Sequence, residues 1–350
     1  MKRLTVSLSL VVIAFLAMGR PAYAHLGWMV HEGQHPGASY SFDPTTLLVV
    51  LGAVSFTVLA FALDGLAWPR RFQAAVEKIY RSLPSGIEWR VISSLAGVLL
   101  IANALRGVFL ADNIALPGGT LAMLGNAVQM GIGLLLVTQL SYAIAGLAIL
   151  TVAVPLAVIA VPVGLLVDYA FEFAALGVAL VLLGATSPRL DPIGYRIAGR
   201  YCKQFGHLPL PVIRVGVGLT LAVLAIHEKL MDPSMALTFL DNHNFNFMPS
   251  LGFSGFTDLH FAFAAGVAEL TLGLLLVMGV ATRFVTAVLS VFFTITMVAF
   301  GPGELMGHLP LFGVAFLLLI HGSGAYRMTL PRKSRLEGLT RPFPQPVSEV

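Results

Sequence analysis

The chain has 350 residues, of which 57% are hydrophobic and only 11% are charged. A soluble domain carries roughly 25% charged residues, so this composition excludes an ordinary soluble protein. The net charge of +4 does not indicate a nucleic acid partner, because the basic residues lie in loops between apolar runs. These runs are about twenty residues long and predict an all-α, polytopic integral membrane bundle that is surrounded by membrane lipid.

Residues 1–24 have the pattern of a secretory signal peptide. Lys2 and Arg3 precede the apolar run LTVSLSLVVIAFLAMG, and the small-x-small sequence AYA ends at Ala24. An uncleaved first helix is the alternative, but Pro21 and the short apolar core favour cleavage. We therefore expect the mature chain to begin at His25.

Residues 25–44 form a segment that we expect to be periplasmic. It contains HLGWMVHEGQH, with His25, His31 and His35. Imidazole is a common ligand of copper and zinc, and an N-terminal histidine can also chelate through its amine. The spacings match no fixed metal motif, so a copper site, completed by His243 or His308, and a polar lead-in with scattered histidines both stay open.

The apolar runs predict nine spans after the signal peptide. Residues 45–87 hold the first span and an amphipathic linker, residues 88–200 and 201–326 each hold four spans, and residues 327–350 are a basic tail. The spans are expected at 45–68, 88–110, 119–141, 143–162, 163–184, 210–230, 258–280, 284–301 and 307–325.

The basic residues of the loops predict how the chain is oriented. Lys and Arg gather in residues 69–87, residues 186–209 and the tail, whereas the alternate loops contain none. The positive-inside rule then places the mature N-terminus in the periplasm and the C-terminus in the cytoplasm of a bacterial plasma membrane. The single cysteine, Cys202, excludes an intramolecular disulfide.

The two groups of four spans have related sequences. Residues 90–103 align without gaps on residues 214–227, and residues 126–137 align on residues 266–277. We interpret this as a parallel tandem repeat. The second copy has His227 and Glu269 where the first has Asn103 and Gln129. Because ionisable residues inside a membrane are costly and usually functional, we expect the chemistry in the second copy.

Four features of the second copy carry a family resemblance. Arg214 opens a helix, Lys229 lies at its far end, and ELTLGLLLVMGVATR (269–283) and GHLPLF (307–312) follow. In these motifs the sequence resembles the DoxX family of small four-helix membrane proteins. That family is similar to the small subunit of thiosulfate:quinone oxidoreductase and is associated with redox chemistry at the membrane. The resemblance therefore implies a quinone and a redox partner subunit.

Glu269 is the ionisable residue expected deepest in the membrane. It lies about eleven residues into its span, which at 1.5 Å per residue is roughly 16 Å. Gly266 and Gly273 lie on nearly the same face and allow a neighbouring helix to approach, so Glu269 should face the bundle. A proton relay or quinone site and a structural hydrogen bond between helices both stay open. Asp168 and Glu172, one turn apart, are a further polar pair.

His227, Glu228 and Lys229 are consecutive, so an α-helix would point them about 100° apart. We expect His227 and Lys229 to face the mouth of the bundle and Glu228 to face water. The leading hypothesis is a DoxX-like subunit of a quinone-linked or redox-protective system. Copper binding or delivery at the outer face and a structural adaptor without catalysis are the alternatives. The predicted site residues are Glu269, His227, Lys229, His308 and Arg214.

Overall fold

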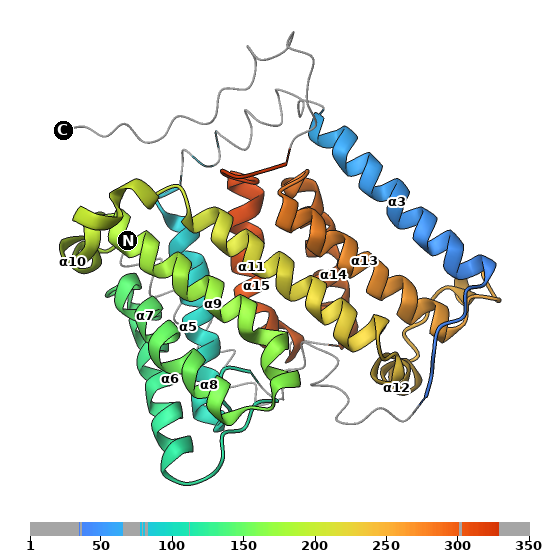
Figure 1. Cartoon of the computed structure of the whole chain (residues 1–350), viewed down its shortest axis with the longest axis horizontal. Helices are drawn as coiled ribbons and strands as arrows, with labels where there is room; N and C mark the ends of the chain where they lie inside the picture. Colours follow the sequence, from blue (N-terminus) through green and yellow to red (C-terminus); the bar gives the residue numbers. More distant parts are fainter. Residues whose placement is uncertain are drawn as a thin grey trace.

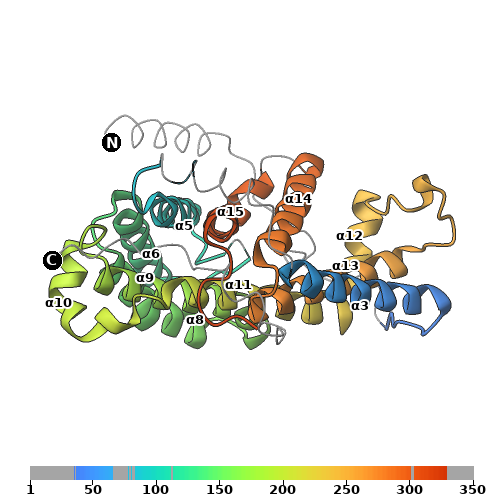
Figure 2. The same cartoon turned by 90° about the horizontal axis from the view of Figure 1, so that it is seen from above.

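The computed structural model describes residues 35, 37–65, 78, 80, 83–111, 113–300 and 303–328. This described part is an α-helical bundle without strands, as expected (Figure 1). The predicted signal peptide and most of the basic tail lie outside the described residues. The long helices lie side by side, and two short helices, α10 and α12, lie at opposite ends of the bundle (Figures 1 and 2).

The long helices match the predicted spans closely. Seven of them are long and apolar enough to cross a membrane, while the last two, α14 and α15, have shorter described apolar stretches. The elements are α3 (Pro44–Gly65), α5 (Ile87–Arg106), α6 (Thr120–Thr138), α7 (Tyr142–Ala148), the π-turn η1 (Ile149–Ala153), α8 (Val154–Ala160), α9 (Val163–Thr186), α10 (Pro192–Cys202), η2 (Lys203–Phe205), α11 (Pro209–Ala225), the π-turn η3 (Ile226–Leu230), α12 (Ser234–His243), η4 (Pro249–Leu251), α13 (Asp258–Met278), α14 (Thr282–Phe300) and α15 (Gly303–His321).

Paired glycines hold two helix pairs in close contact. A Cβ atom on Gly97 of α5 would lie 2.7 Å from the carbonyl oxygen of Gly133 in α6. A Cβ on Gly218 of α11 would lie equally close, 2.7 Å, to the carbonyl oxygen of Gly273 in α13. Only small residues let backbones approach this far. In these two contacts Gly97 and Gly218 occupy equivalent positions. The gapless alignment instead pairs Gly97 with Leu221. The tandem repeat stays a prediction.

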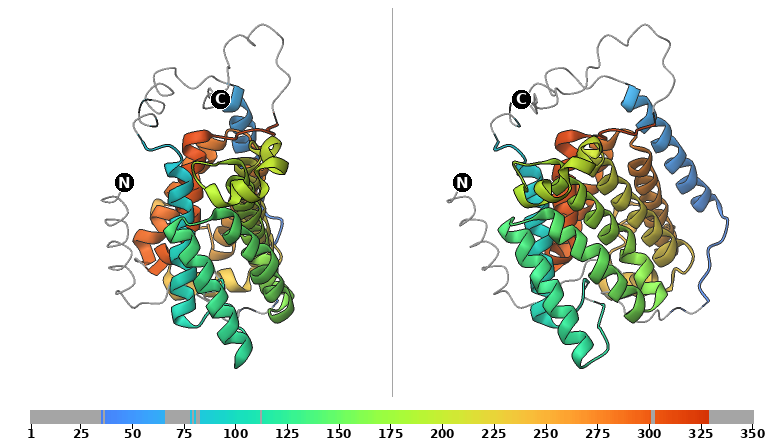
Figure 3. Two further views of the ribbon diagram at one scale, coloured as in Figure 1. Left: turned by 90° about the vertical axis from the view of Figure 1, so that its left-hand side faces the viewer. Right: turned by 60° about the vertical axis from the view of Figure 1, so that its left-hand side comes forward.

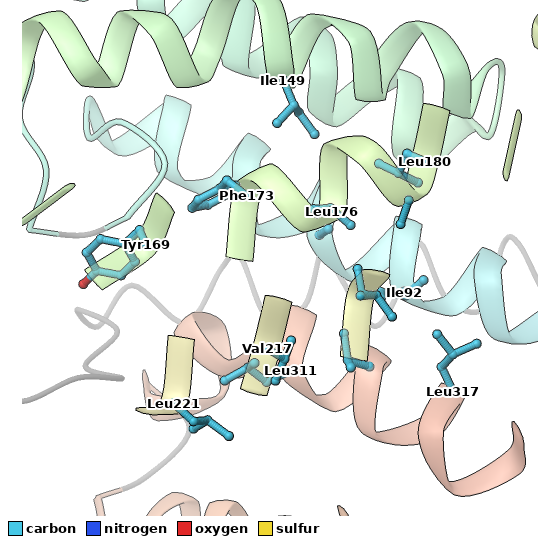
Figure 4. Packing of buried hydrophobic residues seen from close by; sticks show 14 of the residues in the cluster. Ile92, Ile149, Tyr169, Phe173, Leu176, Leu180, Val217, Leu221, Leu311 and Leu317 are labelled. Atoms are coloured by element: carbon cyan, nitrogen blue, oxygen red, sulfur yellow. The ribbon is translucent and has the colours of Figure 1, made fainter. Parts of the chain in front are cut away.

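One hydrophobic core joins the two predicted four-helix units. Ile92 of α5, Leu180 of α9, Val217 of α11 and Leu317 of α15 are all buried in it, and Figure 4 shows these side chains gathered from separate helices. Helix α9 packs on α11, and α15 packs on α5. The helices of the two units therefore interlock and bury a common apolar interior.

Consecutive long helices run in opposite directions, which gives the bundle two distinct ends. We call the end where α5 and α11 begin the arginine end, because it carries Arg90, Arg189, Arg196, Arg200, Arg214 and Arg283. We call the opposite end, where α11 finishes and α13 begins, the histidine end, because it carries His35, His227, His243 and His260. Both ends are visible in Figure 1, at α10 and at α12 respectively.

Helix α3 lies along one edge of the bundle (Figures 1 and 3). It packs on α13, and the ring of Phe56 stacks on Phe284 of α14 with centroids 5.6 Å apart. The Asp64 carboxylate, near its last residue, accepts a hydrogen bond from the backbone N–H of Ala281 at 3.0 Å. Directly before its first residue, Asp43 accepts a hydrogen bond from His260 at 2.8 Å. The helix is therefore tied to the bundle at both ends.

Candidate functional site

The three consecutive ionisable residues lie in a π-turn. The backbone N–H of Met231 donates to the carbonyl of Ile226 at 2.8 Å, five residues earlier, where an α-helix would bond four residues earlier. This wider turn changes the directions of His227, Glu228 and Lys229 from those of an α-helix. Single π-turns inside α-helices are often found at functional sites.

Lys229 and Glu269 form an ion pair between η3 and α13. The Lys229 Nζ atom donates to Glu269 Oε2 at 2.8 Å, and the two side chains are 13% and 34% exposed. Gly266, one turn before Glu269, makes this approach possible, since a Cβ there would lie 3.1 Å from the Cβ of Lys229. Glu269 therefore contacts the neighbouring helix, as predicted.

Tyr40 fixes the backbone beside this pair. Its hydroxyl donates to the carbonyl oxygen of Lys229 at 2.6 Å. Burial raises the pKa of Tyr40 to about 12, and the nearby charge of Asp232 adds to this effect. Tyr40 is therefore a neutral donor at physiological pH and links the segment before α3 to the π-turn.

Glu228 is buried, which corrects the expectation that it faces water. Only 5% of the residue is exposed, and its charge interacts with the ammonium group of Lys229. The side chain of His227 is instead 51% exposed. The expectation for Glu228 assumed an α-helix, whereas the residue lies in a π-turn. Lys229 faces the bundle, as expected.

His227 pairs with a carboxylate of the first predicted unit. Its Nδ1 atom donates to Asp168 Oδ1 on α9 at 2.9 Å, and the Asp168 side chain is only 6% exposed. Gln129, which aligns with Glu269 in the predicted repeat, bonds the backbone groups of Val108 and Leu110. His227 and Lys229 are thus two residues apart in sequence but bind to different helices.

The remaining predicted site residues lie elsewhere in the fold. Arg214 is 1% exposed at the arginine end, where its Nη2 atom donates to the carbonyl of Tyr326 at 2.8 Å. Fifteen residues of helix separate it from Lys229, roughly 22 Å. His308 is buried on α15 with its ring 5.1 Å from that of Phe293. The pair that the structure brings together is therefore Lys229 with Glu269.

Of the three histidines in the copper prediction, the structure describes one. His25 and His31 lie outside the described residues, whereas His35 is hydrogen bonded to Asp241 of α12 at 2.6 Å. Among the described residues no three His, Cys, Asp or Glu side chains are grouped closely enough to hold a metal ion. Copper binding at the mature N-terminus stays a prediction.

Two features of this site had no clear signal in the sequence. The π-turn η3 packs against α13, and its local sequence IHEKL is distinguished only by three adjacent ionisable residues. The contact of Tyr40 with Lys229 joins residues 189 positions apart. A single aromatic residue before a span gives no indication of such a partner.

Comparison with known protein families gives a match to one part of the chain. The model of the DoxX family matches residues 210–302. This match runs from α11 to the end of α14 and contains Arg214, Lys229 and Glu269, but it stops before α15. It confirms the resemblance in the second unit. Neither a comparison with curated proteins nor one with solved structures found a match.

Proposed function

From the DoxX domain at residues 210–302 in a multi-pass membrane protein, we propose that the chain is a subunit of a quinone-linked redox system in the bacterial plasma membrane. The observation that carries this proposal is the ion pair of Lys229 and Glu269 within that domain. The electron-transferring cofactor would belong to a partner subunit.

Burying the charges of Lys229 and Glu269 has an unfavourable desolvation free energy, which a pair that only holds helices together would not need. Charged side chains within a membrane span are rare and usually functional. Well-packed apolar residues often stabilise a protein as much as a buried ion pair, or more. The glycine contact between Gly218 and Gly273 already holds α11 against α13, about one turn from Glu269 along α13. This favours a chemical role for Lys229 and Glu269.

The residues of the pair fit the head group of a quinone. An ammonium group has three N–H donors, and Glu269 accepts one of them, which leaves donors for a carbonyl oxygen. The 34% exposure of Glu269 makes its carboxylate reachable from the side of the bundle. When bound, a quinone supplies two-electron, two-proton chemistry. Lys229 then orients a carbonyl oxygen, and Glu269 holds or releases a proton at Oε2.

A binding measurement on the purified, full-length protein tests this proposal. A short-chain quinone is titrated into wild type and into the Lys229→Met and Glu269→Gln variants, and the quinone that copurifies is quantified after extraction. Loss of one hydrogen bond to a charged group costs about 1.5–3 kcal/mol, so we expect the affinity to fall by roughly tenfold or more.

The ion pair of His227 and Asp168 supplies a matched control. Asp168→Asn alters a carboxylate that faces His227 and leaves Lys229 and Glu269 in place. Its quinone affinity should equal that of wild type. Equal affinity in all four proteins, or no detectable quinone in any, would instead support the structural adaptor.

A further inference from the structure

Helix α10 is fixed across the arginine end of the bundle, between α9 and α11 (Figures 1 and 2). Asp191, which is fully buried, caps its first turn by accepting from the N–H of Gly194 at 2.8 Å. The same carboxylate accepts from the N–H of Ala143 at 2.8 Å and from the hydroxyl of Ser141 at 2.9 Å. These bonds hold α10 in one orientation against α7, with Gly194 on its buried side.

The outward side of α10 has an apolar stripe. Ile193, Ile197 and Tyr201 recur every four residues and are 39%, 68% and 74% exposed. At 3.6 residues per turn these three positions lie within about 80° of one another around the helix. The stripe continues to Phe205 in the turn that follows, which is 37% exposed. Nothing in the described part of the chain covers this stripe.

A basic stripe runs directly beside the apolar one. Arg196 and Arg200 are both exposed and are four residues apart, which places them next to Ile197 on the helix surface. Lys203, also exposed, extends the stripe. A shallow surface groove lies where the two stripes meet, lined by Arg200, Tyr201, Lys203 and Gln204. Adjacent apolar and cationic stripes are the pattern of helices that lie in a membrane interface.

We propose that α10 is an interfacial helix that binds anionic lipid head groups of the leaflet at the arginine end. Arg196, Arg200 and Lys203 contact the phosphates, while Ile193, Ile197 and Tyr201 enter the boundary with the acyl chains. Charge complementarity selects this occupant, since an apolar stripe alone would not require a basic neighbour. Because α9 and α11 both span the membrane, their connection keeps α10 at the level of its surface.

The native Cys202, the only cysteine in the chain, allows the helix position to be measured on the full-length protein. A nitroxide on Cys202 reports immersion through its accessibility to oxygen relative to a water-soluble nickel chelate. The protein is placed in nanodiscs of phosphatidylcholine alone or of a mixture with phosphatidylglycerol. We expect deeper immersion in the anionic bilayer. This gain should vanish in R196Q/R200Q and persist in the charge-conserving R196K/R200K.

Native mass spectrometry of the unlabelled protein gives an independent measurement. Each basic residue near an anionic surface contributes about 1 kcal/mol, so the preference for phosphatidylglycerol should fall roughly fivefold per arginine and about thirtyfold for both. Equal preference in wild type and R196Q/R200Q would overturn the proposal. So would spin–spin broadening between two labelled copies in one nanodisc, which would assign the stripe to a second copy of the chain.

Discussion

At the scale of single residues, the site consists of charged side chains that form ion pairs between helices. His227, Glu228 and Lys229 follow one another in sequence, yet His227 binds Asp168 on α9 and Lys229 binds Glu269 on α13. The two contacts connect α11 to helices on two sides. A substitution at either contact should therefore leave the other intact.

Removing one member of the Lys229–Glu269 pair should cost more than removing both. Glu269→Leu or Lys229→Met leaves the other group without its partner, and each should lower the free energy of unfolding by about 1–3 kcal/mol. The double variant leaves neither Lys229 nor Glu269 without its partner, so it should be more stable than either single variant. Thermal unfolding of all four proteins in one detergent measures this. A double variant whose loss equals the sum of the single losses would show that the two residues are not coupled.

Asp43 makes the start of α3 sensitive to acid. The hydrogen bond from His260 lowers the pKa of Asp43 from 3.8 to about 2, and backbone bonds from Thr46 and Thr45 contribute. The Nδ1 atom of His260 accepts from the N–H of Thr257, so its Nε2 carries the hydrogen that Asp43 accepts. Because the folded pKa is depressed, this stabilisation is present above pH 3.8 and is lost as the pH falls towards 2.

Hydrogen exchange at Thr45 and Thr46 measures this loss. Their N–H groups donate to Asp43 at 2.9 and 2.8 Å, so their protection, corrected for intrinsic rates, should decrease between about pH 4 and pH 2. In Asp43→Asn the protection should not change across that interval. Constant protection of the wild type would contradict the assignment.

At the scale of helices, close approach depends on glycine at particular positions. In α11 and α13 the contact of Gly218 with Gly273 holds the backbones together, and Gly266 admits Lys229. The sequence predicted that Gly266 and Gly273 face a neighbouring helix, because their spacing is a local pattern. It could not predict the π-turn, since apolar periodicity does not distinguish one wider turn from the α-helix that it continues. Nor could it predict the contact of His227 with Asp168, which are 59 residues apart.

Two glycine substitutions should have opposite effects on stability. A Cβ in Gly218→Ala would lie 2.7 Å from the carbonyl oxygen of Gly273, so α11 and α13 must separate and stability should fall by about 1–3 kcal/mol. A Cβ in Gly131→Ala meets nothing within 4 Å, so this variant should gain about 0.5–1 kcal/mol from helix propensity. Thermal unfolding in detergent measures both. Equal changes in the two variants would mean that the glycine contact does not determine the helix separation.

At the scale of the whole molecule, most of the bundle could be predicted because apolar length and loop charge are properties of short segments. The alternating directions of the spans follow from the same pattern. The shared core could not be predicted in this way. The sequence suggested two four-helix units, whereas α9 packs on α11 and α15 on α5 to bury one interior.

The orientation of the bundle in the membrane has a direct test. The loop that contains Ser250 has no Lys or Arg, whereas Cys202 lies among basic residues at the arginine end. An impermeant thiol reagent applied to intact spheroplasts should therefore label Ser250→Cys and leave Cys202 unlabelled. Permeabilised cells control for reactivity. Labelling of Cys202 in intact spheroplasts would reverse the predicted orientation.

The attachment of α3 at both ends restricts which membranes suit this protein. Its 22 residues extend about 33 Å, close to the hydrocarbon thickness of about 30 Å. A free helix adapts to a thinner bilayer by tilting. Helix α3 is held by His260 at its first turn and by Ala281 at its last, so it can tilt only together with α13. A change in bilayer thickness therefore acts as a mechanical load on the helix that carries Glu269.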